Sequence, residues 1–253
     1  MLREVLTAEI FPDAVVAVSA GALNGLPIAN DPSLAQVQML EDLWRDVATD
    51  PPVRGGTLRT LVSILRGRPG FDTGERLRKM IEENVPVVDL GNTLIPIHVG
   101  TTAASTGRLC WWSEGPSVDI LCASAAIPGV FPAVPLTDGD LHMDGGVLSN
   151  LPLRYAVTLQ PTRLVVFDVA ADFLPPEKQT ALTLMLTGFR AATTELTRQE
   201  WLDVPVDIEV LHIELPDPSG GLDLDFGDTD LLFEEGAGAA RAAIAASGWL
   251  SPD

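Results

Sequence analysis

A serine that directly follows a short apolar run is the first residue of the chain that could do chemistry. Residues 14–18 read Ala-Val-Val-Ala-Val, which is too short for a helix and is typical of a buried strand. Ser19, Ala20 and Gly21 come next, and their small side chains allow a sharp turn from strand to helix. A serine on such a turn exposes its hydroxyl, so Ser19 is the candidate nucleophile. The structural alternative is a helix start with this serine as its cap.

Backbone groups of the same turn could stabilise a negative charge next to Ser19. The N–H of Ala20 lies one residue past the serine, and the positive end of the following helix points to the same place. The turn departs from the usual Gly-x-Ser-x-Gly pattern at Ala17, where the pattern has glycine. That departure adds one methyl group at a crowded position.

Asp144 is the candidate base for this serine. It follows the predicted strand 140–143 and precedes Gly145 and Gly146, so its carboxylate stands where two glycines let the backbone turn and other chain approach closely. Burial can raise the proton affinity of a carboxylate until it can serve a serine directly. The structural alternative is a glycine turn capped by an aspartate.

Three histidines are the other candidate bases. The order serine, acid, histidine of the α/β-hydrolases would need His212, which lies inside the predicted strand 206–215 and not at a loop tip. His98 lies in another predicted strand, and His142 lies in the strand that ends at Asp144; such histidines more often pack or satisfy polar neighbours. A histidine-dependent hydrolase is therefore the lesser alternative.

Strands and helices alternate along the chain, which is the pattern of an α/β fold. Strands are predicted at residues 14–18, 94–102, 120–124, 163–170 and 206–215. Helices are predicted at residues 33–48, 72–83, 176–201 and 230–246, with shorter helical segments at 2–6 and 58–65. We expect Asp72 to cap the second helix, because Glu75 sits three positions on. The alternation favours a mainly parallel sheet covered by helices in one domain.

The composition limits the partners that the protein can have. The chain of 253 residues carries 35 acidic against 16 basic side chains, a formal net charge of -19, which repels a nucleic-acid backbone. The same charge disfavours lasting attachment to anionic lipid and leaves transient contact with a membrane surface. The longest apolar run, 120–136, contains three prolines and is shorter than the roughly 20 residues of a spanning helix. It is read as a buried strand and a loop.

Two cysteines, Cys110 and Cys122, cannot form a disulfide framework for a chain of this length. The first residues lack the apolar stretch of a secretory signal. We therefore expect a cytoplasmic protein. Residues 223–228 with Glu234 imitate part of a calcium loop but lack its glycine, so no metal site is expected. Residues 236–238, Gly-Ala-Gly, are read as helix packing.

Several longer motifs resemble the patatin-like phospholipases, in the right order and over nearly the whole chain. They are Val-Ser-Ala-Gly-Ala-Leu-Asn at 18–24, Phe-Asp-Thr at 71–73, Thr-Ala-Ala-Ser-Thr-Gly at 102–107, Ala-Ser-Ala-Ala-Ile-Pro-Gly-Val-Phe-Pro at 123–132 and Met-Asp-Gly-Gly-Val-Leu-Ser-Asn-Leu-Pro at 143–152. The resemblance implies a three-layer α/β/α fold and a lipid acyl hydrolase that works through an acyl-enzyme without a cofactor. Ser19 matches the family nucleophile, and Asp144 matches the aspartate of its Asp-Gly-Gly motif.

The family also places a glycine-rich Gly-Gly-Gly-x-Arg-Gly loop after its first strand, where it supplies the oxyanion hole. Residues 1–6 resemble the body of the helix that follows this loop. We therefore expect the domain 1–253 to be truncated at its N-terminus, and less active and less stable than a form extended upstream. The alternative from another class is a catalytically silent binding module of the same fold.

The two catalytic hypotheses separate in one variant. If His212 is the base, His212→Ala abolishes ester hydrolysis. If Ser19 and Asp144 act as a pair, the same variant keeps most of its activity, which a chromogenic short-chain ester reports. Loss of all hydrolysis in a folded His212→Ala protein would favour the histidine-dependent alternative.

Overall fold

The computed structural model describes residues 1–50, 72–169, 181–215 and 228–249. The chain forms two compact units, one of residues 12–150 and one of residues 1–11 with 151–253. Each unit is described by itself. The single domain expected from the sequence therefore stays a prediction.

The unit 12–150 carries a five-stranded sheet centred on β2. Its strands are β1 (Val15–Ala17), β2 (Ile97–Ala103), β3 (Arg108–Trp112), β4 (Val134–Pro135) and β5 (Leu141–Asp144). β1 is parallel to β2, whereas β3 and β5 are antiparallel to β2 and β4 is antiparallel to β5. The parallel pair is joined through helices, and β2 and β3 form a local hairpin, so the sheet is mixed.

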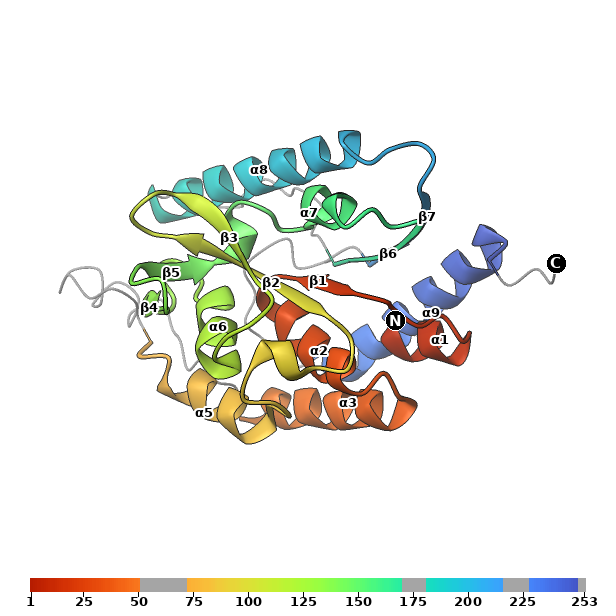
Figure 1. The fold of residues 1–253 in the computed structure, drawn as a ribbon, viewed down its shortest axis with the longest axis horizontal. Coiled ribbons are helices and arrows are strands. Elements are labelled where there is room, and N and C mark those ends of the chain that lie inside the picture. Colours follow the sequence, from red (N-terminus) through yellow and green to blue (C-terminus); the bar gives the residue numbers. More distant parts are fainter. Residues whose placement is uncertain (51–71, 170–180, 216–227, 250–253) are drawn as a thin grey trace. The chain divides into compact units, whose positions relative to one another are not determined.

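Helices α2 and α6 pack on this sheet, and α3 and α5 lie beyond them (Figure 1). Their bounds are α2 (Ser19–Asn30), α3 (Leu34–Thr49), α5 (Glu75–Asn84) and α6 (Ser117–Ser124), with one-turn helices η1 (Leu90–Asn92) and η2 (Gly145–Val147). The predicted helix 33–48 is confirmed as α3. Ser33 caps it by accepting a hydrogen bond from the Gln36 N–H at 3.1 Å. The predicted segment 58–65 lies outside the described residues.

The predicted cap at Asp72 is wrong by two residues. The Asp72 carboxylate accepts a hydrogen bond from the Gly74 N–H at 2.8 Å, which closes a turn before the helix. Gly74 itself is the N-cap, in the left-handed region at φ +76°, and α5 begins at Glu75. A capping box with Asp72 would place Glu75 at the third position of the helix. In the structure, Glu75 is the first residue of α5.

The predicted strand 120–124 is also wrong, because these residues form the end of helix α6. Its residues Ile120, Leu121, Cys122, Ala123 and Ser124 are all buried. A buried helix end has the same continuous apolar run as a buried strand, and periodicity does not separate the two.

The other unit is built on the parallel pair β6 (Arg163–Asp168) and β7 (Glu209–Glu214). Its helices are α1 (Leu2–Thr7), α7 (Leu153–Thr158), α8 (Ala181–Leu202) and α9 (Thr229–Ser247). The predicted strands and long helices of this part are confirmed within a few residues; residues 170 and 176–180 lie outside the described part. Leu211 and Ile213 of β7 pack with Val5 of α1 and with α9 in one apolar cluster.

The Gly-Ala-Gly segment 236–238 is expected to serve helix packing, and Gly236 does so. A Cβ on Gly236 would lie 3.4 Å from Cγ of Met1, so this glycine lets α9 approach the start of the chain closely. A Cβ on Gly238 would meet nothing within 4 Å. No helix among the described residues is long and apolar enough to cross a membrane.

Gly100 in β2 is the tightest place in the sheet that a substitution can test. A Cβ there would lie 2.8 Å from Cγ1 of Val18 and 2.9 Å from the ring of Trp111. We expect Gly100→Ala to lower the free energy of unfolding by about 1–3 kcal/mol through overpacking. Gly21→Ala is the matched control in the same unit, since its Cβ would meet only Ala17 at 3.9 Å.

The control should be neutral or more stable by about 0.5–1 kcal/mol, because alanine favours helix over glycine. Urea unfolding of the three proteins measures both effects. Equal stability of Gly100→Ala and the unchanged protein would contradict the crowding at β2.

Candidate active site

Two strands of the unit 12–150 end at the same place on β2. At Val99, β2 is paired with Ala17 of β1 and with Trp112 of β3. At Thr101, it is paired with Asp144 of β5 and again with β3. Since a strand has two edges and β3 occupies one of them, β1 and β5 share the other. The carboxyl ends of β1 and β5 therefore meet beside Gly100, the residue of β2 between Val99 and Thr101.

Ser19 follows β1 at this meeting point and has a strained backbone. Its φ is +50°, in the left-handed region that a residue with a Cβ rarely adopts. Its N–H donates to the hydroxyl of Ser124 at 2.9 Å, and its own hydroxyl donates to Oδ2 of Asp144 at 2.7 Å. The N-cap of α2 is Val18, so the Ser19 hydroxyl is aimed at the carboxylate and does not cap the helix.

Asp144 ends β5 and uses its two carboxylate oxygens for different tasks. Oδ1 accepts a hydrogen bond from the Gly146 N–H at 2.7 Å, which caps η2, while Oδ2 accepts from Ser19. The residue is 5% exposed. Burial raises the pKa of this carboxyl from 3.8 to about 6, against the hydrogen bonds from Ser19 and Gly146, which lower it. Asp144 is therefore both the cap of a glycine turn and the hydrogen-bond partner of Ser19, the two alternatives that the sequence offers for it.

The backbone around Asp144 is held on both sides. Its N–H donates to the carbonyl of Ala126 at 3.0 Å, and its carbonyl accepts from the Thr102 hydroxyl at 2.9 Å. A Cβ on Gly145 would overlap the carbonyl oxygen of Gly100, and one on Gly146 would lie 3.1 Å from Oδ1 of Asp144. The two glycines of the motif therefore allow the turn to lie directly against β2.

The alanine that departs from the usual pattern fits this turn without displacing it. The Ala17 methyl is 3.9 Å from where a Cβ on Gly21 would stand and 3.5 Å from where one on Gly25 would stand. Glycines on the facing side of α2 thus leave room for it. Ala20 and Gly21 are exposed in the first turn of α2, where N–H groups have no partner within the helix.

The histidines are occupied elsewhere. His142 is fully buried, with Nδ1 2.9 Å from the Thr101 hydroxyl and Nε2 3.0 Å from the Asp138 carboxylate. His212 lies in β7 and contacts Asp168 at 3.2 Å and the ring of Trp201. Burial lowers the pKa of His98.

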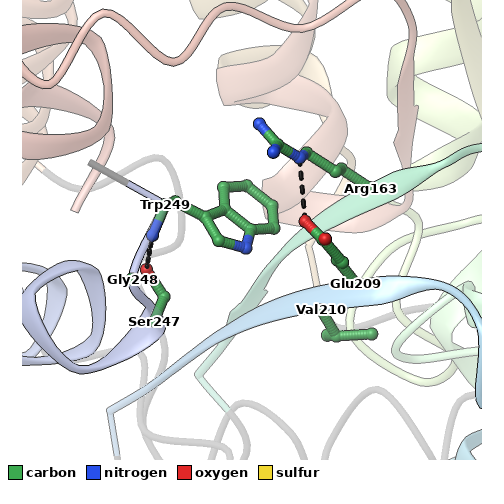
Figure 2. Close-up of a pocket in the computed structure, with 6 residues that line it drawn as sticks. All are labelled: Arg163, Glu209, Val210, Ser247, Gly248 and Trp249. Carbon is green, nitrogen blue, oxygen red and sulfur yellow. Dashed lines mark hydrogen bonds and ion pairs between the residues drawn. The ribbon is translucent and has the colours of Figure 1, made fainter. Parts of the chain in front are cut away.

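A pocket of about 370 Å³ in the other unit contains none of these residues. Figure 2 shows its lining, where the Nε of Arg163 donates to Glu209 at 2.9 Å. The same guanidinium lies 5.1 Å from the ring centre of Trp249. These contacts link the end of α9 to β6 and β7. Among the described residues, no cluster of three or more acidic, histidine or cysteine side chains could hold a metal ion; residues 223–227 of the calcium-like segment lie outside them.

The part of the chain that carries this site matches a known protein family. The patatin-like phospholipase family matches residues 1–157, which is more than half of the chain and includes both Ser19 and Asp144. The chain belongs to the patatin-like phospholipase family. The α/β/α fold class expected from the sequence is confirmed, with a sheet of mixed strand pairs.

Relatives of this patatin-like chain are distant. Protein M110.7 of Caenorhabditis elegans, named for a patatin-like phospholipase domain, is 22% identical over 84% of the chain, and the match covers 18% of that protein. An NTE family protein of Mycobacterium bovis, Mb1092c, and one of Mycobacterium tuberculosis, Rv1063c, are each 32% identical over 38% of the chain. The match covers 28% of either mycobacterial protein. The patatin-like chain therefore spans less than a third of these relatives.

Sequence reasoning did not find two residues that hold this patatin-like pair. Ser124 lies in the motif that carries the family resemblance, but the run 120–124 predicts a strand, which gives its hydroxyl no defined direction. Gly100 lies inside a predicted strand as a single glycine, which is a known sign of close backbone approach.

The raised pKa of Asp144 makes the stability of the protein depend on pH. The folded state binds this proton more tightly than the unfolded state, so the stabilisation is complete below pH 3.8 and is lost as the pH rises through about 6. Asp144→Asn removes the dependence. The gap between 3.8 and about 6 corresponds to at most roughly 3 kcal/mol. We expect the variant to be more stable by up to that amount at neutral pH, and similar to the unchanged protein near pH 4.

Urea unfolding at both pH values measures this difference. Asp140→Asn is the control, because Asp140 is exposed and its hydrogen bond from Ser105 lowers the pKa of its carboxyl. It should give no gain at neutral pH. An Asp144→Asn protein that is less stable than the unchanged protein at neutral pH would contradict the burial cost assigned to the carboxylate.

Proposed function

We propose that the protein is a serine acyl hydrolase that cleaves acyl esters of lipids, with Ser19 as nucleophile and Asp144 as general base. The observation that supports this most directly is the 2.7 Å hydrogen bond from the Ser19 hydroxyl to a carboxylate that is 5% exposed. A carboxyl with a pKa of about 6 is ionised at neutral pH and is a stronger base than an exposed aspartate. Membership of the patatin-like phospholipase family agrees with an ester substrate.

In the first half of the reaction, Asp144 takes the hydroxyl proton as Ser19 Oγ bonds to the ester carbonyl carbon. The carbonyl oxygen becomes an oxyanion, and the Ala20 and Gly21 N–H groups at the start of α2 are candidate donors to it. The C–O bond to the alcohol then breaks, and Asp144 returns the proton to the leaving alkoxide. The acyl group remains on Ser19.

In the second half, water attacks the acyl-enzyme with Asp144 again as base. The Ser19 Oγ leaves and recovers a proton, and the carboxylic acid is released. No metal or cofactor enters either half. The two carboxylate oxygens keep separate tasks throughout, since Oδ1 stays on the Gly146 N–H while Oδ2 exchanges the proton.

The proposal includes a cytoplasmic location and transient contact with a membrane surface. Cys110 and Cys122 are free thiols, and burial raises the pKa of Cys122 to about 11, which keeps it protonated and unreactive. Free thiols agree with a cytoplasmic location. The strongly acidic chain would meet its lipid substrate through transient contact with a membrane surface.

A fluorophosphonate probe tests the nucleophile. The probe should label the protein at one site, and Ser19→Ala should abolish labelling while the circular dichroism spectrum is unchanged. Ser105→Ala is the matched control, because Ser105 also donates to an aspartate, Asp140, but at the surface. It should label as the unchanged protein does. A protein that is folded and never labelled would favour the silent binding module, and labelling that survives Ser19→Ala would place the nucleophile elsewhere.

The labelling rate should also depend on pH through Asp144. The base must be deprotonated, so the rate rises with pH around a midpoint near 6 and is about tenfold below its plateau at pH 5. A midpoint near pH 4 would mean that Asp144 is not the base or is not buried in solution.

A further inference from the structure

The hydroxyl of Ser124 connects the candidate nucleophile to the centre of the sheet. Ser124 is the last residue of α6 and is fully buried. Its Oγ donates to the carbonyl of Gly100 at 2.8 Å and accepts from the Ser19 N–H at 2.9 Å. Since a hydroxyl has one proton, donation to Gly100 leaves its lone pairs for the Ser19 N–H.

The Ser19 N–H is a group that needs such a partner. Ser19 is the first residue of α2, so its N–H has no acceptor within the helix. Its φ of +50° is a strained conformation that persists only where surrounding contacts impose it. The bond to Ser124 supplies one of these contacts, and it also removes the Ser19 N–H from the donors that could face an oxyanion.

The Gly100 carbonyl connects the same hydroxyl to the turn that carries Asp144. The oxygen that accepts from Ser124 is the one that a Cβ on Gly145 would overlap. Cγ1 of Val18 would also lie 2.9 Å from that Cβ. The turn before Ser19 and the turn after Asp144 therefore both rest on Gly100, and Ser124 ties the nucleophile to it.

We propose that Ser124 is a positioning residue for the Ser19–Asp144 pair: its hydroxyl fixes the Ser19 backbone against the Gly100 carbonyl, so that the Ser19 hydroxyl meets the buried carboxylate. Ser124 does not touch the reacting atoms. The inference rests on the proposed function, and it extends it by naming a residue outside the pair that sets the pair's geometry.

The test compares two serines of one helix. Ser124→Ala removes both hydrogen bonds. Ser117→Ala is the control: Ser117 is also in α6 and fully buried, and its hydroxyl has no hydrogen-bond partner among the described residues. We expect Ser124→Ala to slow fluorophosphonate labelling at the pH plateau by about tenfold or more, since loss of a single positioning contact at an active site commonly costs this much. Ser117→Ala should label at the unchanged rate.

A pH profile separates positioning from a general loss of structure. The bond from Ser19 lowers the pKa of Asp144, so a displaced serine should move the midpoint of labelling above 6. A ¹³C NMR titration of the Asp144 carboxyl reads the same midpoint without any activity. Ser124→Cys keeps the same number of side-chain heavy atoms with a weaker donor and acceptor, and it should give a smaller shift in the same direction. This variant serves where Ser124→Ala fails to fold.

The outcomes distinguish the inference from the function it rests on. If Ser19→Ala abolishes labelling but Ser124→Ala and Ser124→Cys keep the rate and midpoint of the unchanged protein, Ser124 does not position the pair. Equal effects of Ser124→Ala and Ser117→Ala would also overturn the inference. If the unchanged protein is never labelled and the NMR midpoint still moves in Ser124→Ala, the positioning role holds and the proposed function fails.

Discussion

The close approach of three chain segments at Gly100 is the constraint on which the candidate site depends. β1 and β5 run toward each other along one edge of β2, and both end beside this residue. A side chain here would collide with Val18, which precedes Ser19, and with Trp111 on the opposite edge. Gly145 is needed for the same reason on the other side of the contact. Ser19 and Asp144 meet because β2 has a glycine, Gly100, where the turns that carry them pack against its backbone.

The energetic consequence of this arrangement falls on the aspartate. A carboxylate that is 5% exposed loses much of its hydration, and two donors, the Ser19 hydroxyl and the Gly146 N–H, offset part of that loss. The remaining penalty is the raised pKa. Above pH 6 the folded protein therefore holds a charge that the unfolded chain would hold at lower cost. Strain at Ser19 adds to this burden. The Ser19 N–H donates to the Ser124 hydroxyl and the Thr102 hydroxyl donates to the Asp144 carbonyl, and these two hydrogen bonds keep both residues in place.

Local patterns in the sequence predict the elements well where one face is apolar, as in α3, and where β-branched residues form a short run, as in β6. They fail for α6, because its last five residues, 120–124, are all buried and give a continuous run with no helical period. The cap at Asp72 fails because Gly74 can adopt a left-handed backbone that starts the helix later. The Asp-Gly-Gly turn makes Asp144 a candidate base for Ser19 and the family resemblance supports the pair, but residues 125 positions apart share no local signal that predicts their contact. The hydroxyl of Ser124, 105 positions from Ser19, could not be assigned a partner at all.

Two serine–aspartate hydrogen bonds among the described residues of the unit 12–150 differ in the burial of the carboxylate. Ser105 donates to Asp140 at the surface, where water solvates the carboxylate and the hydrogen bond lowers its pKa. Ser19 donates to Asp144 in the interior, where desolvation outweighs the same kind of bond and raises the pKa to about 6. An exposed carboxylate is too weak a base to take a proton from a serine, while a buried one lies close to the range in which general bases work. The property that separates the two carboxylates is therefore the burial of Asp144. It follows from the position of Asp144 at the inner end of β5, under the turn that its own glycines allow.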